Sequence, residues 1–176
     1  MNVVLGAPGW LIAILFLVLA AAAVEDAWRL RISNFTCLAV LILAVVAAAL
    51  HGFSLGMWQN IAVLAALLAL GTLAFSAGAL GGGDVKLLAA LGLWTDIRGA
   101  IWLIATVFIA GGLLALLFIA GRKILQRPGN RDRRKNRIPY GIAIAAGALI
   151  SFTAGRVEQG RLHQPHLPPT IVPLSH

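Results

Sequence analysis

Five long apolar runs dominate the chain and restrict the folds that it can adopt. Each is long enough to cross roughly 30 Å of hydrocarbon as a helix. Only 11% of the residues are charged and the mean hydropathy is +0.92, whereas a soluble domain carries about 25% charged residues. Apolar and polar residues do not alternate at period two, and such alternation is what a β-barrel would require. The sequence therefore predicts an all-α, polytopic membrane bundle. The runs cover about residues 8–24, 35–51, 60–79, 99–120 and 138–154.

A shorter apolar segment, residues 85–95, decides how often the chain crosses the membrane. If it crosses, there are about six spans, and 11 of the 14 basic residues fall on one side. Since basic residues concentrate on the cytoplasmic side, we expect six crossings with both termini outside. The 11 are Arg29, Arg31, Lys86, Arg122, Lys123, Arg127, Arg131, Arg133, Arg134, Lys135 and Arg137, whereas Arg98, Arg156 and Arg161 lie on the other side.

The two ends of the chain differ in character. The first run is predicted to be a retained span, because MNVVLGAPGW lacks the positive charge of a signal peptide. Residues 1–154 are expected to form one membrane domain. Residues 155–176 are rich in proline, histidine and polar residues and are predicted to be disordered. The single cysteine, Cys37, excludes an internal disulfide and a four-cysteine zinc site.

The stretch GALGGGDVKLLAALG, residues 78–92, interrupts the apolar pattern with three glycines and Asp84. Glycine weakens a helix and lets another chain approach closely. We expect the break to end the preceding span and to place Asp84 at the start of the next helix, where the helix dipole favours a carboxylate. Two spans separate Asp84 from Asp26, so both aspartates are predicted at the same cytoplasmic boundary.

A pair of carboxylates on one face suggests general acid–base hydrolysis, because close carboxylates share a proton near neutral pH. Simpler interpretations remain open. Asp84 is also explained as a helix N-cap, and the glycines as small residues for helix packing. Asp26, which lies beside Glu25 and Arg29, is also explained as an interfacial acid that reaches water.

Three blocks of the sequence, in order, resemble the type IV prepilin peptidase family, bacterial membrane aspartyl peptidases that remove prepilin leaders. The resemblance covers most of residues 10–154. It looks like the short form found in tight-adherence (Flp-type) pilus systems, because the first loop cannot hold the cysteine-bound zinc insert of the long forms. The blocks are GGGDVKLLAALG (81–92) against the family's G-x-G-D-x-K-L, EDAWRLRISN (25–34) against its first-aspartate block, and RIPYGIAIAAGAL (137–149) against its Ile-Pro-Tyr-Gly.

Carried onto this chain, the resemblance implies that Asp26 and Asp84 are the catalytic pair and that Gly81 and Gly83 shape the active-site loop. Lys86 matches a recurrent lysine of the family. Three roles for it remain open: binding an acidic group of the substrate, biasing the shared proton, or facing cytoplasmic water. Ser33 stands where the family usually has proline, which predicts a looser turn after Arg31.

The resemblance also implies an activity and a location. We expect an endopeptidase of the bacterial inner membrane that cuts a prepilin or pseudopilin, a short basic leader followed by a hydrophobic helix, at the cytoplasmic face. No metal, cofactor, N-methyltransferase activity or nucleic-acid partner is expected. The basic loop, residues 121–137, is a predicted contact for anionic lipid. The sequence leaves the oligomeric state undetermined.

Two other functions fit parts of the pattern. In a small ion-coupled transporter, Asp26 and Asp84 would relay protons or bind a cation. The chain shows no second glycine break of the kind that inverted repeats often carry. A non-catalytic assembly scaffold would retain the helices, and the intact aspartates speak against it.

Overall fold

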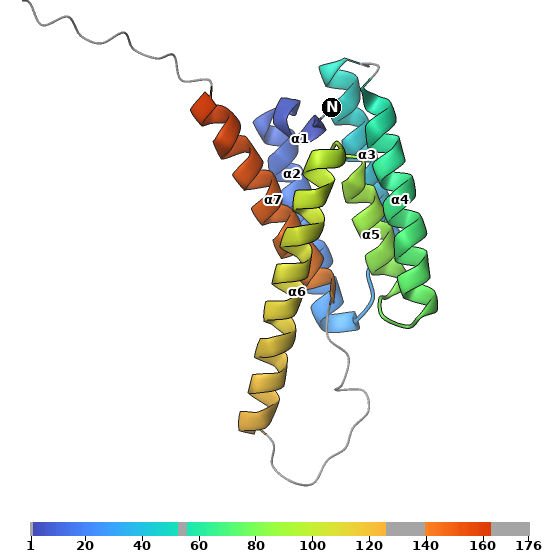
Figure 1. Cartoon of the computed structure of the whole chain (residues 1–176), viewed down its shortest axis with the longest axis vertical. Helices are drawn as coiled ribbons and strands as arrows, with labels where there is room; N and C mark the ends of the chain where they lie inside the picture. Colours follow the sequence, from blue (N-terminus) through green and yellow to red (C-terminus); the bar gives the residue numbers. More distant parts are fainter. Residues whose placement is uncertain (1, 53–55, 126–139, 163–176) are drawn as a thin grey trace, which may run out of the picture.

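The computed structural model describes residues 2–52, 56–125 and 140–162, and these form a bundle of helices that alternate in direction along the chain (Figure 1). Two of the described helices, α1 and α5, are short, and the other five are long. Their bounds are α1 Val3–Gly6, α2 Gly9–Arg29, α3 Asn34–His51, α4 Met57–Ser76, α5 Gly82–Gly92, α6 Ile97–Leu125 and α7 Tyr140–Leu162.

Five of these helices are long and apolar enough to cross a membrane, which confirms the polytopic helical bundle. They correspond to the five apolar runs. The segment predicted as a sixth span forms α5, which has 11 residues. A helix of that length extends about 16 Å, which is shorter than the roughly 30 Å of a hydrocarbon core, and α5 reverses the chain direction between α4 and α6.

The short helix α5 lies among the longer ones, and most of its side chains are buried. It packs against α3, α4 and α7. Glycines of both helices permit the close packing of α4 against α5. A Cβ at Gly71 of α4 would lie 2.6 Å from Val85, and one at Gly92 of α5 would lie 2.9 Å from Leu67. These small residues let the helices approach closely.

The turn between α5 and α6 lies inside the bundle, partway along α3. Trp94 is completely buried, and its indole N–H donates to the carbonyl of Val40 at 3.1 Å. The amide of Asn60 donates to the Leu93 carbonyl at 2.9 Å, and the N–H of Val4 in α1 donates to the Trp94 carbonyl at 3.2 Å. Irregular backbone that is shielded from water needs such partners, and they explain how α5 can end early.

The structure describes only part of what the sequence predicted for the C-terminal tail and the basic loop. Helix α7 continues to Leu162, beyond the end of the membrane domain predicted at residue 154. The remainder of the predicted tail, residues 163–176, lies outside the described residues. The same holds for residues 126–139, which include most of the basic loop predicted to contact anionic lipid.

Candidate active site

Asp26 lies in the last turn of α2 and is 4% exposed. Its Oδ2 atom accepts a hydrogen bond of 2.7 Å from the backbone N–H of Gly141, at the start of α7. The first N–H groups of a helix have no partner within that helix and favour an anion. The carboxylate of Asp26 therefore ties the end of α2 to the beginning of α7.

Helix α2 ends at Arg29, one turn after Asp26, through an unusual backbone conformation at Leu30. Leu30 takes the left-handed region, with φ of 52°, and its N–H donates to the carbonyl oxygen of Asp26 at 2.8 Å. Residues other than glycine rarely adopt this conformation, and they cluster at functional sites when they do. The turn at Leu30 reverses the chain close to Asp26, and α3 then begins at Asn34.

Asp84 is the third residue of α5 and is 8% exposed. Its Oδ2 atom accepts a hydrogen bond of 3.2 Å from the N–H of Gly81, which precedes the helix. The other carboxyl oxygen, Oδ1, is buried and has no hydrogen-bond partner among the described residues. One oxygen thus holds the first turn of α5 in place, and the other keeps unused hydrogen-bonding capacity.

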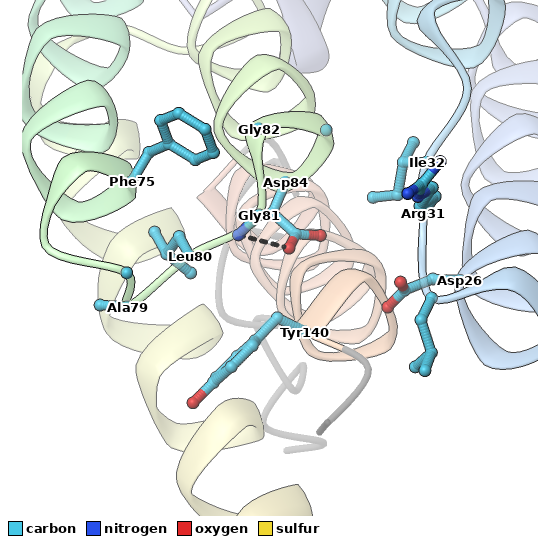
Figure 2. Close-up of a pocket in the computed structure, with 13 residues that line it drawn as sticks. Asp26, Arg31, Ile32, Phe75, Ala79, Leu80, Gly81, Gly82, Asp84 and Tyr140 are labelled. Atoms are coloured by element: carbon cyan, nitrogen blue, oxygen red, sulfur yellow. Dashed lines mark hydrogen bonds between the residues drawn. The ribbon is translucent and has the colours of Figure 1, made fainter. Parts of the chain in front are cut away.

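The two aspartates line one partly open cavity of about 780 Å³. Figure 2 shows them on opposite walls, with their carboxyl groups turned toward each other. The rest of the lining comes from the loops that follow α2 and α4, the last turn of α4, the first residues of α5 and the first residue of α7. The lining residues are Asp26, Leu30, Arg31, Ile32, Phe75, Gly78, Ala79, Leu80, Gly81, Gly82, Gly83, Asp84 and Tyr140.

The position of Asp84 changes its acidity. Burial and, to a smaller extent, the nearby carboxylate of Asp26 raise the pKa of Asp84 from its ordinary value near 3.8 to about 6, and the hydrogen bond from Gly81 opposes this rise. A carboxyl group with this pKa retains its proton in weakly acidic solution. Asp84 can therefore act as a proton donor, a role that is closed to an ordinary surface aspartate.

Gly81 and Gly83 have different steric reasons to be glycine. A Cβ at Gly81 would lie 2.8 Å from Oδ2 of Asp84, and one at Gly83 would lie 3.0 Å from the carbonyl oxygen of Ile32. At Gly82 the nearest atom, on Phe75, would be 3.6 Å away, which is an ordinary contact. Close approach is thus required at the first and third glycines, whereas the middle position has room for a methyl group.

This difference leads to a prediction for the glycine loop. We expect Gly81→Ala to lower the cleavage rate by about 10-fold or more, because its methyl group displaces the Asp84 carboxyl group from its hydrogen bond. Gly82→Ala, the matched control one residue away, should keep the rate within about three-fold of wild type, since no close contact opposes it. Initial rates of substrate cleavage by the purified proteins provide the measurement. Equal losses in both variants would contradict the steric explanation.

Lys86 is exposed and does not line the cavity. Its Nζ atom donates a 2.9 Å hydrogen bond to the side-chain oxygen of Asn34, at the start of α3. Of the three roles left open for this lysine, the arrangement favours the one in which it faces water. It joins the beginnings of α3 and α5 at the surface.

Sequence reasoning expected the two aspartates at the same end of the bundle, and both line one cavity, but it did not find what holds them. The contact of Asp26 with Gly141 joins residues that are 115 positions apart in the chain, so no local pattern reveals it. A signal was present, because Gly141 belongs to the Ile-Pro-Tyr-Gly block. No group of three or more His, Cys, Asp or Glu side chains gathers into a metal-binding arrangement within residues 2–52, 56–125 and 140–162.

Comparison with known proteins identifies one family. The model of the type IV leader peptidase family matches residues 13–119, which include both aspartates and the glycine loop. No curated protein and no solved structure matches the chain.

Proposed function

The chain belongs to the type IV leader peptidase family, and we propose that it is an aspartic endopeptidase that removes the leader of Flp-type prepilins. Asp26 and Asp84 are its catalytic pair, and Gly81 and Gly83 shape the loop that carries Asp84. The observation that carries the proposal is the shared cavity, into which two buried aspartates turn their carboxyl groups.

The surroundings of each aspartate suggest its role. Asp26 accepts a hydrogen bond from the start of α7, which stabilises its ionised form, so we assign it as the general base. Asp84 has a pKa raised to about 6 by burial and by Asp26, so we assign it as the general acid. A pair that holds one proton between two carboxyl groups is suited to this division of labour.

In the proposed reaction, Asp26 takes a proton from water while the water oxygen attacks the carbonyl carbon of the scissile peptide bond. Asp84 gives its proton to the carbonyl oxygen, and a neutral tetrahedral gem-diol forms. The gem-diol then collapses: one of its hydroxyl groups returns a proton to Asp84, the C–N bond breaks, and the proton on Asp26 passes to the leaving amine. Both aspartates regain their starting protonation states.

The location of the site supports a substrate that is anchored in the membrane. Asp26 lies at the end of a long apolar helix, and the cavity beside it is built from loops and helix ends. A hydrophobic helix of the substrate can lie in the bilayer while the extended junction to its leader enters the cavity. We place this site at the cytoplasmic face of a bacterial inner membrane, with both termini outside, because that orientation gathers the basic residues inside.

Processing of a prepilin in cells tests the proposal. The chain is co-expressed with an Flp-type prepilin in a host that lacks its own leader peptidase, and the double variant Asp26→Asn/Asp84→Asn is the control. We expect a shortened pilin only with the wild-type protein. An intact prepilin beside a folded, membrane-inserted wild-type protein would overturn the proposal, and proton-linked solute uptake under the same conditions would favour a transporter.

The acidity of Asp84 leads to a prediction about pH. Because the protonated form of Asp84 is the active one, its population falls as the pH rises through its pKa of about 6. We therefore expect kcat/KM to fall nearly 10-fold per pH unit above about pH 7, since this parameter reports the free enzyme. Cleavage of a detergent-solubilised prepilin between about pH 5 and pH 8 is the measurement. A profile that is flat over this range would contradict the assignment of Asp84 as the acid.

A further inference from the structure

The loop between α2 and α3 touches both halves of the site although it carries neither aspartate. Its residue Ile32 is buried. A Cβ at Gly83, next to Asp84, would lie 3.0 Å from the Cβ of Ile32, and a Cβ at Gly141 would lie 2.8 Å from the Cδ1 of Ile32. The Ile32 side chain therefore fills the space between the start of α5, which bears Asp84, and the start of α7, which binds Asp26.

Glu25 fastens this loop. Its Oε2 atom accepts hydrogen bonds from the backbone N–H of Ser33, at 3.1 Å, and from the hydroxyl of Thr36, at 3.2 Å. Glu25 is the neighbour of Asp26, but its carboxylate binds the beginning of α3, whereas Asp26 lines the cavity. Two adjacent carboxylates on one helix end thus hold two different segments.

The backbone N–H that Ser33 donates to Glu25 would be missing if this residue were proline. Proline has no N–H, so the bond from this position to Glu25 exists because the chain has serine where its family usually has proline. Ser33 also caps α3, since its hydroxyl accepts the N–H of Phe35 at 3.1 Å. The sequence predicted a looser turn in the absence of proline, and these bonds hold the turn by another route.

We propose that Glu25 is a positioning residue that, by fixing the α2–α3 loop, presses Ile32 between Gly83 and Gly141 and so sets the separation of Asp26 and Asp84. The inference rests on the proposed function. Glu25 does not line the cavity and transfers no proton. Its effect reaches the aspartates through the packing of one side chain, because buried contacts at close-packed density transmit displacements.

Two pairs of variants separate positioning from an electrostatic effect of the Glu25 charge. Glu25→Gln retains an oxygen acceptor for Ser33 and Thr36, and we expect kcat within about three-fold of wild type. Glu25→Ala loses the acceptor, and we expect kcat to fall about 10-fold to 100-fold with little change in KM, because misplaced catalytic groups slow chemistry more than binding. Thr36→Ser should behave like wild type, and Thr36→Val should lie between wild type and Glu25→Ala. Thr153→Val, whose hydroxyl bonds only within α7, is the control for the substitution itself.

Backbone hydrogen exchange in detergent provides a readout that does not require cleavage. In Glu25→Ala we expect faster exchange in residues 31–36 and also in residues 81–85, the two segments that Ile32 joins. If wild type does not cleave prepilin, the proposed function fails, and hydrogen exchange still tests the coupling. Faster exchange confined to 31–36, or a loss in Glu25→Gln equal to that in Glu25→Ala, would overturn the inference. Should Glu25→Ala fail to fold, Thr36→Val and Thr36→Ser provide the same comparison with a smaller perturbation.

Discussion

Replacement of Asp26 or of Asp84 by asparagine is expected to lower prepilin cleavage by about 10³-fold or more. Each substitution keeps the shape of the side chain and removes one of the two groups that move protons, and such groups contribute up to about 10⁴-fold each. Asp26→Asn leaves the attacking water without a base. Asp84→Asn leaves the developing oxyanion without a proton. Single-turnover cleavage of a purified prepilin by each variant is the measurement.

Thermal unfolding separates this loss from misfolding. In the folded protein the pKa of Asp84 is about 6, against an ordinary value near 3.8. Ionisation of Asp84 therefore costs more in the folded state than in the unfolded state, and this penalty grows as the pH rises from about 4 to about 6. We expect the Tm of Asp84→Asn, relative to wild type, to rise over that range and then level off.

Cleavage by either single variant at more than about a tenth of the wild-type rate would contradict the catalytic pair.

Gly141→Ala is expected to reduce cleavage by about 100-fold, although residue 141 has no side chain. Its methyl group would lie 2.8 Å from Oδ2 of Asp26, 2.9 Å from Cβ of Asp26 and 2.8 Å from Cδ1 of Ile32. Such distances force the start of α7 away from the base, and a displacement of about 1 Å is enough for a loss of this size. The measurement is kcat and KM for a purified prepilin, with the larger change expected in kcat.

Gly155→Ala is the matched control, because it lies in the same helix and its Cβ would meet no atom closer than 3.7 Å, on Leu5. Alanine favours a helix interior over glycine by about 1 kcal/mol, so this variant should be at least as stable as wild type and fully active. Unchanged cleavage by Gly141→Ala would contradict the close contact between α7 and Asp26. A similar loss in Gly155→Ala would point to a general sensitivity of α7 instead.

Much of the fold was readable from the sequence because the determining forces are local. Each apolar run became a helix, since a long apolar segment buries its backbone polar groups only by bonding within itself. The glycine break ended α4 at Ser76 and began α5 at Gly82, as the weak helix propensity of glycine requires. Asp84 took a place in the first turn of α5, where its carboxyl group binds Gly81.

The length of α5 was less predictable. Residues 85–95 have the apolar composition of a span, yet the helix stops at Gly92. Two bonds stabilise the early stop: the Trp94 side chain donates to the carbonyl of Val40 in α3, and the Asn60 side chain donates to the carbonyl of Leu93 in the α5–α6 turn. These bonds join distant segments, so the sequence alone did not show where α5 ends.

By itself, the sequence determined the helices, their alternation and the end of the bundle at which Asp26 and Asp84 lie, because hydropathy and chain connectivity act along the chain. Only the tertiary structure decided what surrounds each carboxyl group. Gly141 binds Asp26, one oxygen of the buried Asp84 has no partner among the residues that the structure describes, and Ile32 packs between Gly83 and Gly141. Such contacts depend on how closely helices approach, and that distance is set by side chains that meet across the bundle rather than by neighbours in sequence.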